Sequence, residues 1–154
     1  MNGSGGAECT MEEYIMQLEK CVELHPYAMI LREKDMDRQD YRELARRIQI
    51  MCREASVKMF VHSDISAAEY AGCGNVHFSM EHFKQMCEEQ ADVIKGLDCV
   101  SVSCHSIEEA VNATRAGADQ IVLGTIFETQ CKPGKMGACL LYTSDAADDR
   151  ISVD

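Results

Sequence analysis

Apolar positions along the chain follow two alternating spacings, which predict a repeated order of strand and helix. Short apolar runs indicate strands, and between them apolar residues recur every three or four positions, as on one face of a helix. Predicted strands start near Tyr27, Lys58, Asn75, Cys99 and Gln120. Predicted helices cover residues 11–24, 37–55, 65–71, 80–97 and 106–117. Such alternation implies parallel strands joined by right-handed crossovers.

The spacing of the predicted strands indicates a class of fold. The strands start about 23 residues apart, close to the roughly 25 residues per unit of a small (β/α)₈ barrel. We therefore expect an α/β chain that forms an incomplete TIM barrel, with about five of the eight parallel βα units. A doubly wound open sheet is the alternative on pattern alone. Two strands, Tyr27–Leu31 and Ile121–Leu123, are expected to be buried.

Composition and charge argue against some classes of binding partner. The chain has 154 residues and a formal net charge of −11, which argues against non-specific binding to nucleic acid or to anionic membranes. No run approaches the roughly 18 apolar residues of a membrane span. The N-terminus lacks the basic and apolar regions of a signal peptide. We expect a cytoplasmic protein with no membrane or nucleic-acid partner.

The nine cysteines do not form a recognisable metal or redox motif. None lies in a Cys-x-x-Cys pair, so zinc-ribbon and thioredoxin interpretations fail. Several fall on predicted apolar faces, where cysteine packs as a small hydrophobic residue. Reduced thiols are expected.

Polar residues gather just after the last predicted strand. Thr129 supplies a hydroxyl and Lys132 a cation, and Gly124, Pro133 and Gly134 shape the backbone around them. Ligands of α/β folds bind at the carboxyl ends of strands. The cluster suits an anionic, phosphorylated ligand, whereas a solvated loop is the alternative interpretation.

Five motifs occur in an order and spacing that resemble one family. They are Leu-Arg-Glu-Lys-Asp at 31–35, Val-His at 76–77, Val-Ser-Cys-His-Ser-Ile-Glu-Glu-Ala at 102–110, Ala-Gly-Ala-Asp at 116–119 and Gly-Thr-Ile-Phe-Glu-Thr-Gln-Cys-Lys at 124–132. Together they resemble the thiamine-phosphate synthase/TenI family. The resemblance implies a (β/α)₈ barrel. It also implies coupling of hydroxymethylpyrimidine diphosphate to a thiazole phosphate with release of pyrophosphate, or aromatisation of a thiazole tautomer in the TenI branch.

The resemblance also assigns substrate-binding residues. Arg32, Lys34 and Lys132 match the cations that hold the pyrimidine diphosphate, and Ser103 matches a serine beside its phosphates. The loop that touches the thiazole phosphate matches Thr129, Gln130 and Cys131. Without the family, an ion pair of Arg32 and Lys34 with Glu33 or Asp35 on a solvated rim is the alternative.

Two departures from the family bear on its Mg²⁺ ion. An Asn-Asp pair after the third strand of the family is replaced by His62 and Ser63, and a later aspartate aligns with His82. Mg²⁺ prefers oxygen ligands, so both expected carboxylates are absent. Use of Mg²⁺ would then depend on the diphosphate itself, with help from Asp64 or Glu81. His62 is predicted to contact the substrate, and a structural histidine is the alternative.

His105 is the candidate for proton transfer. It matches a histidine of the tautomerase branch, and a neutral imidazole suits proton transfer near neutral pH. The predicted function is thiamine-phosphate synthase, with small phosphorylated substrates. A TenI-like thiazole tautomerase and a non-catalytic phosphate-binding regulator are the alternatives. His77, on a short strand, is expected to be structural.

The two ends of the chain are expected to lie outside the barrel. Residues 1–10 are rich in Gly and Ser and are predicted to be disordered. Residues 139–154 form a predicted non-native tail, because 139–149 resemble a translated sequencing adapter. Residues 11–138 then form a partial barrel whose activity by itself is doubtful. Nothing in the sequence predicts the oligomeric state.

Overall fold

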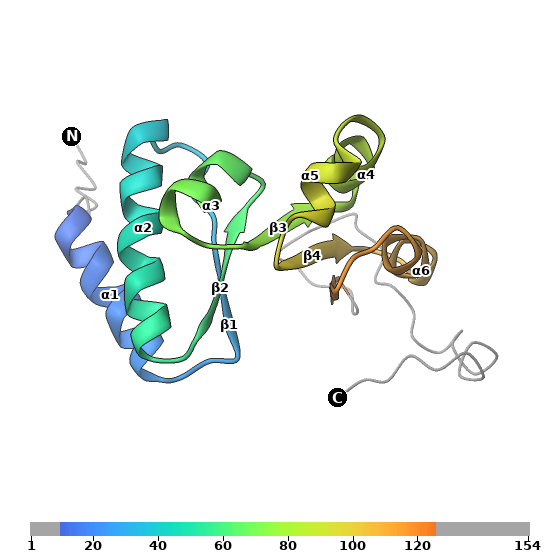
Figure 1. The fold of residues 1–154 in the computed structure, drawn as a ribbon. Coiled ribbons are helices and arrows are strands. Elements are labelled where there is room, and N and C mark those ends of the chain that lie inside the picture. Colours follow the sequence, from blue (N-terminus) through green and yellow to red (C-terminus); the bar gives the residue numbers. More distant parts are fainter. Residues whose placement is uncertain (1–9, 126–154) are drawn as a thin grey trace, which may run out of the picture. The chain divides into compact units, whose positions relative to one another are not determined.

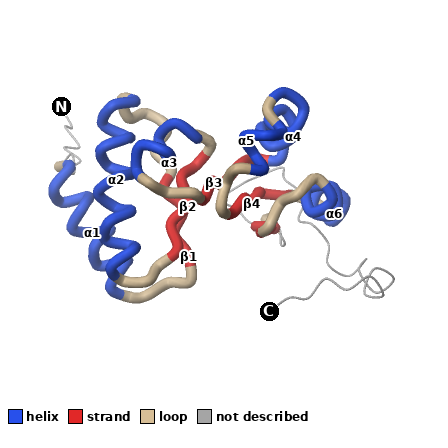
Figure 2. The backbone as a smooth tube through the Cα atoms, viewed as in Figure 1, coloured by secondary structure: helices blue, strands red, loops and turns tan. Residues whose placement is uncertain are grey.

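The computed structural model describes residues 10–125. The chain divides into two compact units, Met1–His77 and Phe78–Asp154. Figure 1 labels the helices and strands, and Figure 2 shows their regular alternation along the backbone. Among the described residues, no helix is both long enough and apolar enough to span a membrane.

The first unit contains three helices and a parallel sheet. Its elements are α1 (Met11–Glu23), β1 (Ala28–Leu31), α2 (Arg38–Glu54), β2 (Lys58–His62), α3 (Ile65–Ala71) and the start of β3 (Asn75–Ser79). Strand β2 lies between β1 and β3, with Leu31 opposite Val61 and His62 opposite His77. Helix α2 packs between α1 and α3 (Figure 1).

Local chemistry explains where these helices begin and end. The side chains of Thr10, Asp37 and Asp64 each accept a backbone N–H in the first turn of α1, α2 and α3, which satisfies donors that have no partner within the helix. Helix α3 covers residues 65–71, as predicted, and ends at Gly72. The left-handed φ of 66° at Gly72 costs glycine little, because glycine has no Cβ.

The core of the first unit lies between α2 and the sheet. Helix α2 buries Leu44, Ala45, Ile48 and Cys52 at helical spacing. Strand β2 buries Met59, Phe60 and Val61 in succession, as expected for a parallel strand covered on both faces. The hydrophobic residues thus place the carboxyl ends of β1 and β2 side by side.

The second unit repeats the alternation. Its elements after β3 are α4 (Met80–Glu89), α5 (Ala91–Lys95), β4 (Cys99–Cys104), α6 (Ile107–Arg115) and β5 (Gln120–Leu123). Strands β4 and β5 are parallel, with Ser101 opposite Gln120 and Cys104 opposite Leu123. The order of strands and helices confirms the α/β class predicted from the sequence.

Three predictions about these elements were wrong in detail. The single helix expected over 80–97 is divided at Gln90, whose φ of −143° and ψ of 46° interrupt the helical backbone. The strand 121–123 is not buried on both faces, because Val122 is 45% exposed and β5 pairs only with β4 in the described part of the chain. In β1, only Leu31 is buried.

Candidate functional site

A cleft of about 290 Å³ opens at the carboxyl ends of β1 and β2. Ligand sites of α/β folds occupy this end of the strands. Its lining comes from the segment after β1, the first turn of α2 and the end of β2: Arg32, Glu33, Lys34, Met36, Arg38, Tyr41, His62 and Asp64. The cleft therefore contains three of the substrate-binding residues predicted from the sequence, Arg32, Lys34 and His62.

Three cations line this cleft. Arg32 and Lys34 directly follow β1, and Arg38 is the first residue of α2. Among the described residues, neither Arg32 nor Lys34 forms an ion pair, so the geometry does not support the alternative of pairing with Glu33 or Asp35. Both side chains are exposed, and their charges are available to an anion in the cleft.

Arg38 was not identified from the sequence. It lies three residues before the buried Tyr41 and directly after the N-cap Asp37. A helix that follows a parallel strand begins at the carboxyl end of that strand, so its first turn belongs to the same edge of the sheet. The place of Arg38 at the start of the helix that follows β1 was therefore the signal in the sequence that could have identified it.

The two carboxylates of the cleft are both engaged. Glu33 accepts a hydrogen bond from the Tyr14 hydroxyl, and burial together with this bond raises the pKa of Tyr14. One oxygen of Asp64 accepts the Ala67 N–H at 2.8 Å, and the other lies 3.9 Å from Arg38 Nε. Both carboxylates therefore stabilise the protein structure around the cleft.

Two histidine rings meet at the ends of β2 and β3. The rings of His62 and His77 lie 5.7 Å apart between centroids, and His77 is buried, with 3% of its surface exposed. Burial lowers the pKa of His77 to about 4, and the charges of His62 and Arg32 act in the same direction. His77 is therefore neutral at pH 7 and packs beneath His62, which agrees with the structural role predicted for it.

Tyr41 is a buried member of the lining. Its hydroxyl donates to the Leu31 carbonyl at 2.9 Å, and burial raises its pKa to about 12. The phenol is thus neutral and ties α2 to the end of β1, which holds Arg38 near Arg32 and Lys34.

The second unit places Ser103 and His105 at the end of β4. Ser103 is half-buried within the strand, and His105 follows it on the exposed side of the chain. The backbone N–H of His105 donates to Glu109 Oε2 at 2.7 Å, and the ring Nδ1 contacts the Gly124 carbonyl oxygen. A carbonyl can only accept, so Nδ1 carries a proton, and Nε2 is the other ring nitrogen.

The other residues predicted from the sequence lie away from the cleft or beyond the described range. Thr129, Gln130, Cys131 and Lys132 lie outside the described residues. His82, at the position of a family carboxylate, lies on α4 with its ring edge-on to Phe78, 5.3 Å between centroids.

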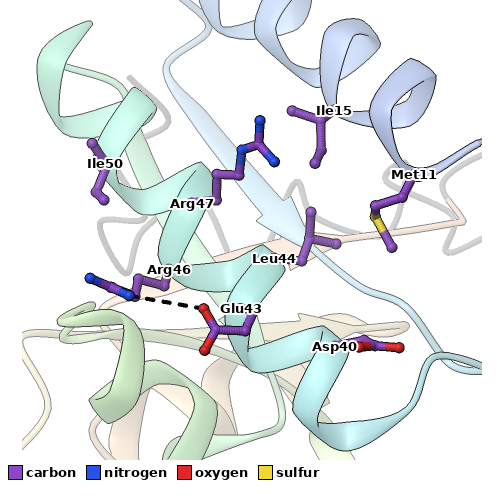
Figure 3. Close-up of a pocket in the computed structure, with 8 residues that line it drawn as sticks. All are labelled: Met11, Ile15, Asp40, Glu43, Leu44, Arg46, Arg47 and Ile50. Atoms are coloured by element: carbon purple, nitrogen blue, oxygen red, sulfur yellow. Dashed lines mark ion pairs between the residues drawn. The ribbon is translucent and has the colours of Figure 1, made fainter.

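A larger hollow of about 450 Å³ lies between α1 and α2 (Figure 3). Apolar side chains and two acid and two basic residues of the helices line it: Met11, Ile15, Asp40, Glu43, Leu44, Arg46, Arg47 and Ile50. Arg46 pairs with Glu43 at 3.9 Å, and every residue of this lining belongs to α1 or α2. The smaller cleft is the better candidate, because strand ends contribute to its lining and it contains Arg32, Lys34 and His62.

The family model of thiamine monophosphate synthase (TMP-TENI) matches residues 4–148. This match overlaps the segments assigned above to the disordered N-terminus and to a non-native tail, and both assignments stay predictions.

Curated relatives are similar over a large part of the chain. A thiamine-phosphate synthase of Clostridium novyi (strain NT) is 29% identical over 133 residues, 86% of this chain and 60% of the relative. One of Geobacillus kaustophilus (strain HTA426) is 35% identical over 95 residues, 60% of this chain and 41% of the relative. The chain therefore spans about half the length of these relatives.

A solved structure shows the same fold. The thiamine phosphate pyrophosphorylase of Pyrococcus furiosus matches with a TM-score of 0.63 and 22% identity, over 75% of this chain and 55% of that one. The five-stranded α/β chain thus has an incomplete TIM-like (β/α) fold, as predicted.

Proposed function

The chain belongs to the thiamine monophosphate synthase family, and on that premise we propose that it is part of a thiamine-phosphate synthase. The proposed reaction couples hydroxymethylpyrimidine diphosphate to a thiazole phosphate and releases pyrophosphate. The proposed protein is thus a transferase that acts on small phosphorylated substrates, and the name thiamine-phosphate synthase of the relatives supports this proposal.

The observation that carries the proposal is the cationic cleft of the first unit. Arg32, Lys34 and Arg38 converge on one hollow, and a diphosphate is the part of the substrates that needs several positive charges. Negative charge grows on the pyrophosphate as its bond to the pyrimidine methylene carbon breaks. Fixed cations that face this charge lower the barrier more than they stabilise the bound substrate.

Residues of the second half of the chain have proposed roles as well. Ser103 is proposed to contact the phosphates, and Lys132 to add a further cation. The loop with Thr129, Gln130 and Cys131 is proposed to contact the thiazole phosphate. These roles follow from the family and from the position of Ser103 at the end of β4.

Catalysis is proposed to need more than this chain. Since the chain covers 41–60% of the synthases named above, about half of their fold has no counterpart here. We expect the 154-residue chain alone to bind anions without forming product.

The test is an assay of pyrophosphate release by the longer reading frame that contains this chain, with both substrates and with each one alone. Release that requires both substrates is expected, and Arg32→Ala is expected to lower kcat/KM by about 100-fold, as for a lost charge-assisted contact in the transition state. Arg53→Ala is the matched control, because Arg53 is exposed in the last turn of α2, away from the strand ends. It is expected to leave the rate unchanged.

Two other outcomes of these assays would contradict the proposed synthase and favour another function. Conversion of the thiazole tautomer without pyrophosphate release, lost in His105→Ala, would indicate a TenI-like tautomerase in which Nε2 of His105 transfers the proton. Ligand-induced stabilisation with neither reaction would indicate a regulator that binds phosphates.

A further inference from the structure

We propose that the cleft of the first unit binds a diphosphate through protein cations alone, without Mg²⁺. The proposal rests on the proposed function for the nature of the ligand, and on the structure for how the charge is balanced. The donor groups that line the cleft carry the argument.

The residues present do not fit a Mg²⁺ site. Mg²⁺ requires near-octahedral oxygen ligands at about 2.1 Å. The family positions of its ligands are occupied by His62, Ser63 and His82, and the imidazoles of His62 and His82 offer nitrogen. His62 packs on the His77 ring and His82 on Phe78. Among residues 10–125, no group of three or more His, Cys, Asp or Glu side chains could hold a metal ion.

The two carboxylates that line the cleft are held by other groups. Glu33 accepts the Tyr14 hydroxyl. Asp64 caps α3 through Ala67 and faces Arg38. Oδ1 of Asp64 accepts the Ala67 N–H in the first turn of α3, so only Oδ2, which now faces Arg38, could turn to a metal.

The cations of the cleft supply the charge that a metal would otherwise provide. Arg32, Lys34 and Arg38 come from two adjoining segments, and Tyr41 ties those segments together. Guanidinium groups match phosphate oxygens with paired N–H donors. His62 lines the cleft at the end of β2, with the ring of the neutral His77 5.7 Å away between centroids.

The primary experiment measures binding of inorganic pyrophosphate to the full 154-residue chain by calorimetry, in EDTA and in excess Mg²⁺. We expect binding in EDTA that Mg²⁺ does not strengthen. Arg38→Ala is expected to weaken it by about 10- to 100-fold, the usual value of a charge-assisted contact. Arg53→Ala, at the other end of the same helix, is the matched control and is expected to bind normally. Binding seen only with Mg²⁺ would overturn the proposal.

The variant Asp64→Asn distinguishes binding through protein cations from binding through a metal, because the two predict opposite changes in pyrophosphate affinity. Asparagine still caps α3, so the fold is kept while one negative charge beside Arg38 is removed. With protein cations alone, pyrophosphate binding strengthens several-fold, as expected when a like charge is removed from the site. A metal held by Asp64 would instead be lost, and binding would weaken.

A second variant restores the family's carboxylate. Ser63 has a φ of 60°, a conformation that Asp adopts readily, so Ser63→Asp is compatible with the backbone. We expect this variant to gain Mg²⁺-dependent binding that the natural chain lacks. Equal Mg²⁺ dependence in both chains would contradict the proposal.

These outcomes are independent of turnover. Pyrophosphate binding in EDTA without product formation by the longer protein would leave this inference standing and remove the proposed function. Product formation that requires Mg²⁺, with no pyrophosphate binding in EDTA, would overturn this inference and support the proposed function.

Discussion

The carboxyl ends of the strands differ in chemistry between the two units. In the first unit, three cations surround a cleft whose carboxylates are occupied by Tyr14, Ala67 and Arg38. In the second unit, the end of β4 presents His105, whose ring Nδ1 contacts the Gly124 carbonyl oxygen and whose backbone N–H donates to Glu109. The same βα architecture therefore offers an anion site in one unit and a proton-transfer candidate in the other. The difference lies in the residues that follow each strand.

The strands themselves differ in burial. Strand β2 has a neighbour on each side and three successive residues that are no more than 1% exposed, Met59, Phe60 and Val61. Strand β5 pairs with β4 alone in the described part of the chain, and Val122 is 45% exposed. Strand β2 is thus buried along most of its length, whereas β5 leaves Val122 exposed.

The largest expected effect tests this difference in burial. Phe60→Ala removes a fully buried ring and is expected to lower the free energy of unfolding by about 3–5 kcal/mol. Val122→Ala changes a half-exposed side chain and is expected to cost less than about 1 kcal/mol. Urea denaturation followed by circular dichroism measures both. A loss of several kcal/mol in Val122→Ala would contradict the exposure of Val122 in β5.

The next effect concerns the buried His77. Its folded pKa of about 4 lies below the ordinary value of 6.5, so the unfolded chain binds more protons between these values. Above pH 6.5 the neutral form of His77 makes its full contribution to the free energy of unfolding. This contribution, on the order of 2 kcal/mol, is lost as pH falls toward 4. Unfolding measured from pH 7.5 to 4 is expected to show this decline.

His77→Gln is the matching variant. It loses some packing at every pH, but the part of the decline that belongs to His77 is expected to disappear from its pH profile. An unchanged slope in His77→Gln would assign the decline to other groups of the first unit.

The smallest effect is at the second unit. The Ser106 hydroxyl accepts the Glu109 N–H at 3.1 Å and caps α6. Ser106→Ala is expected to destabilise the fold by about 1 kcal/mol, and Ser106→Asp, which can still cap, to have little effect. Thermal unfolding compares the two variants. Equal melting temperatures for Ala and Asp would show that this cap does not stabilise the helix.

Much of the fold was predictable because its signals are local. Helix α3 ends at Gly72 as expected, and Asp37 caps α2, since capping and left-handed turns depend on a few neighbouring residues. The division at Gln90 was not predicted, because apolar positions continue across it and the backbone there has no Gly or Pro to mark a break.

The candidate site was predictable only in part. Arg32, Lys34 and His62 follow strands and were found from their position and the family resemblance. Arg38 and Tyr41 were missed because they belong to a helix. The crossover geometry brings Arg38 to the cleft, and Tyr41 has the helical spacing of an ordinary core residue. Thr129, Gln130, Cys131 and Lys132 lie outside the described residues and stay predictions.

The sequence by itself determined the order of helices and strands, the family and the type of residue after each strand. Those properties depend on the period of apolar residues and on short motifs, which are written along the chain. Only the tertiary structure decided which charges meet. It brought Arg38 to the edge that holds Arg32 and Lys34 and placed it beside Asp64. Such convergence depends on packing between distant segments, because a parallel sheet places residues far apart in sequence at one edge.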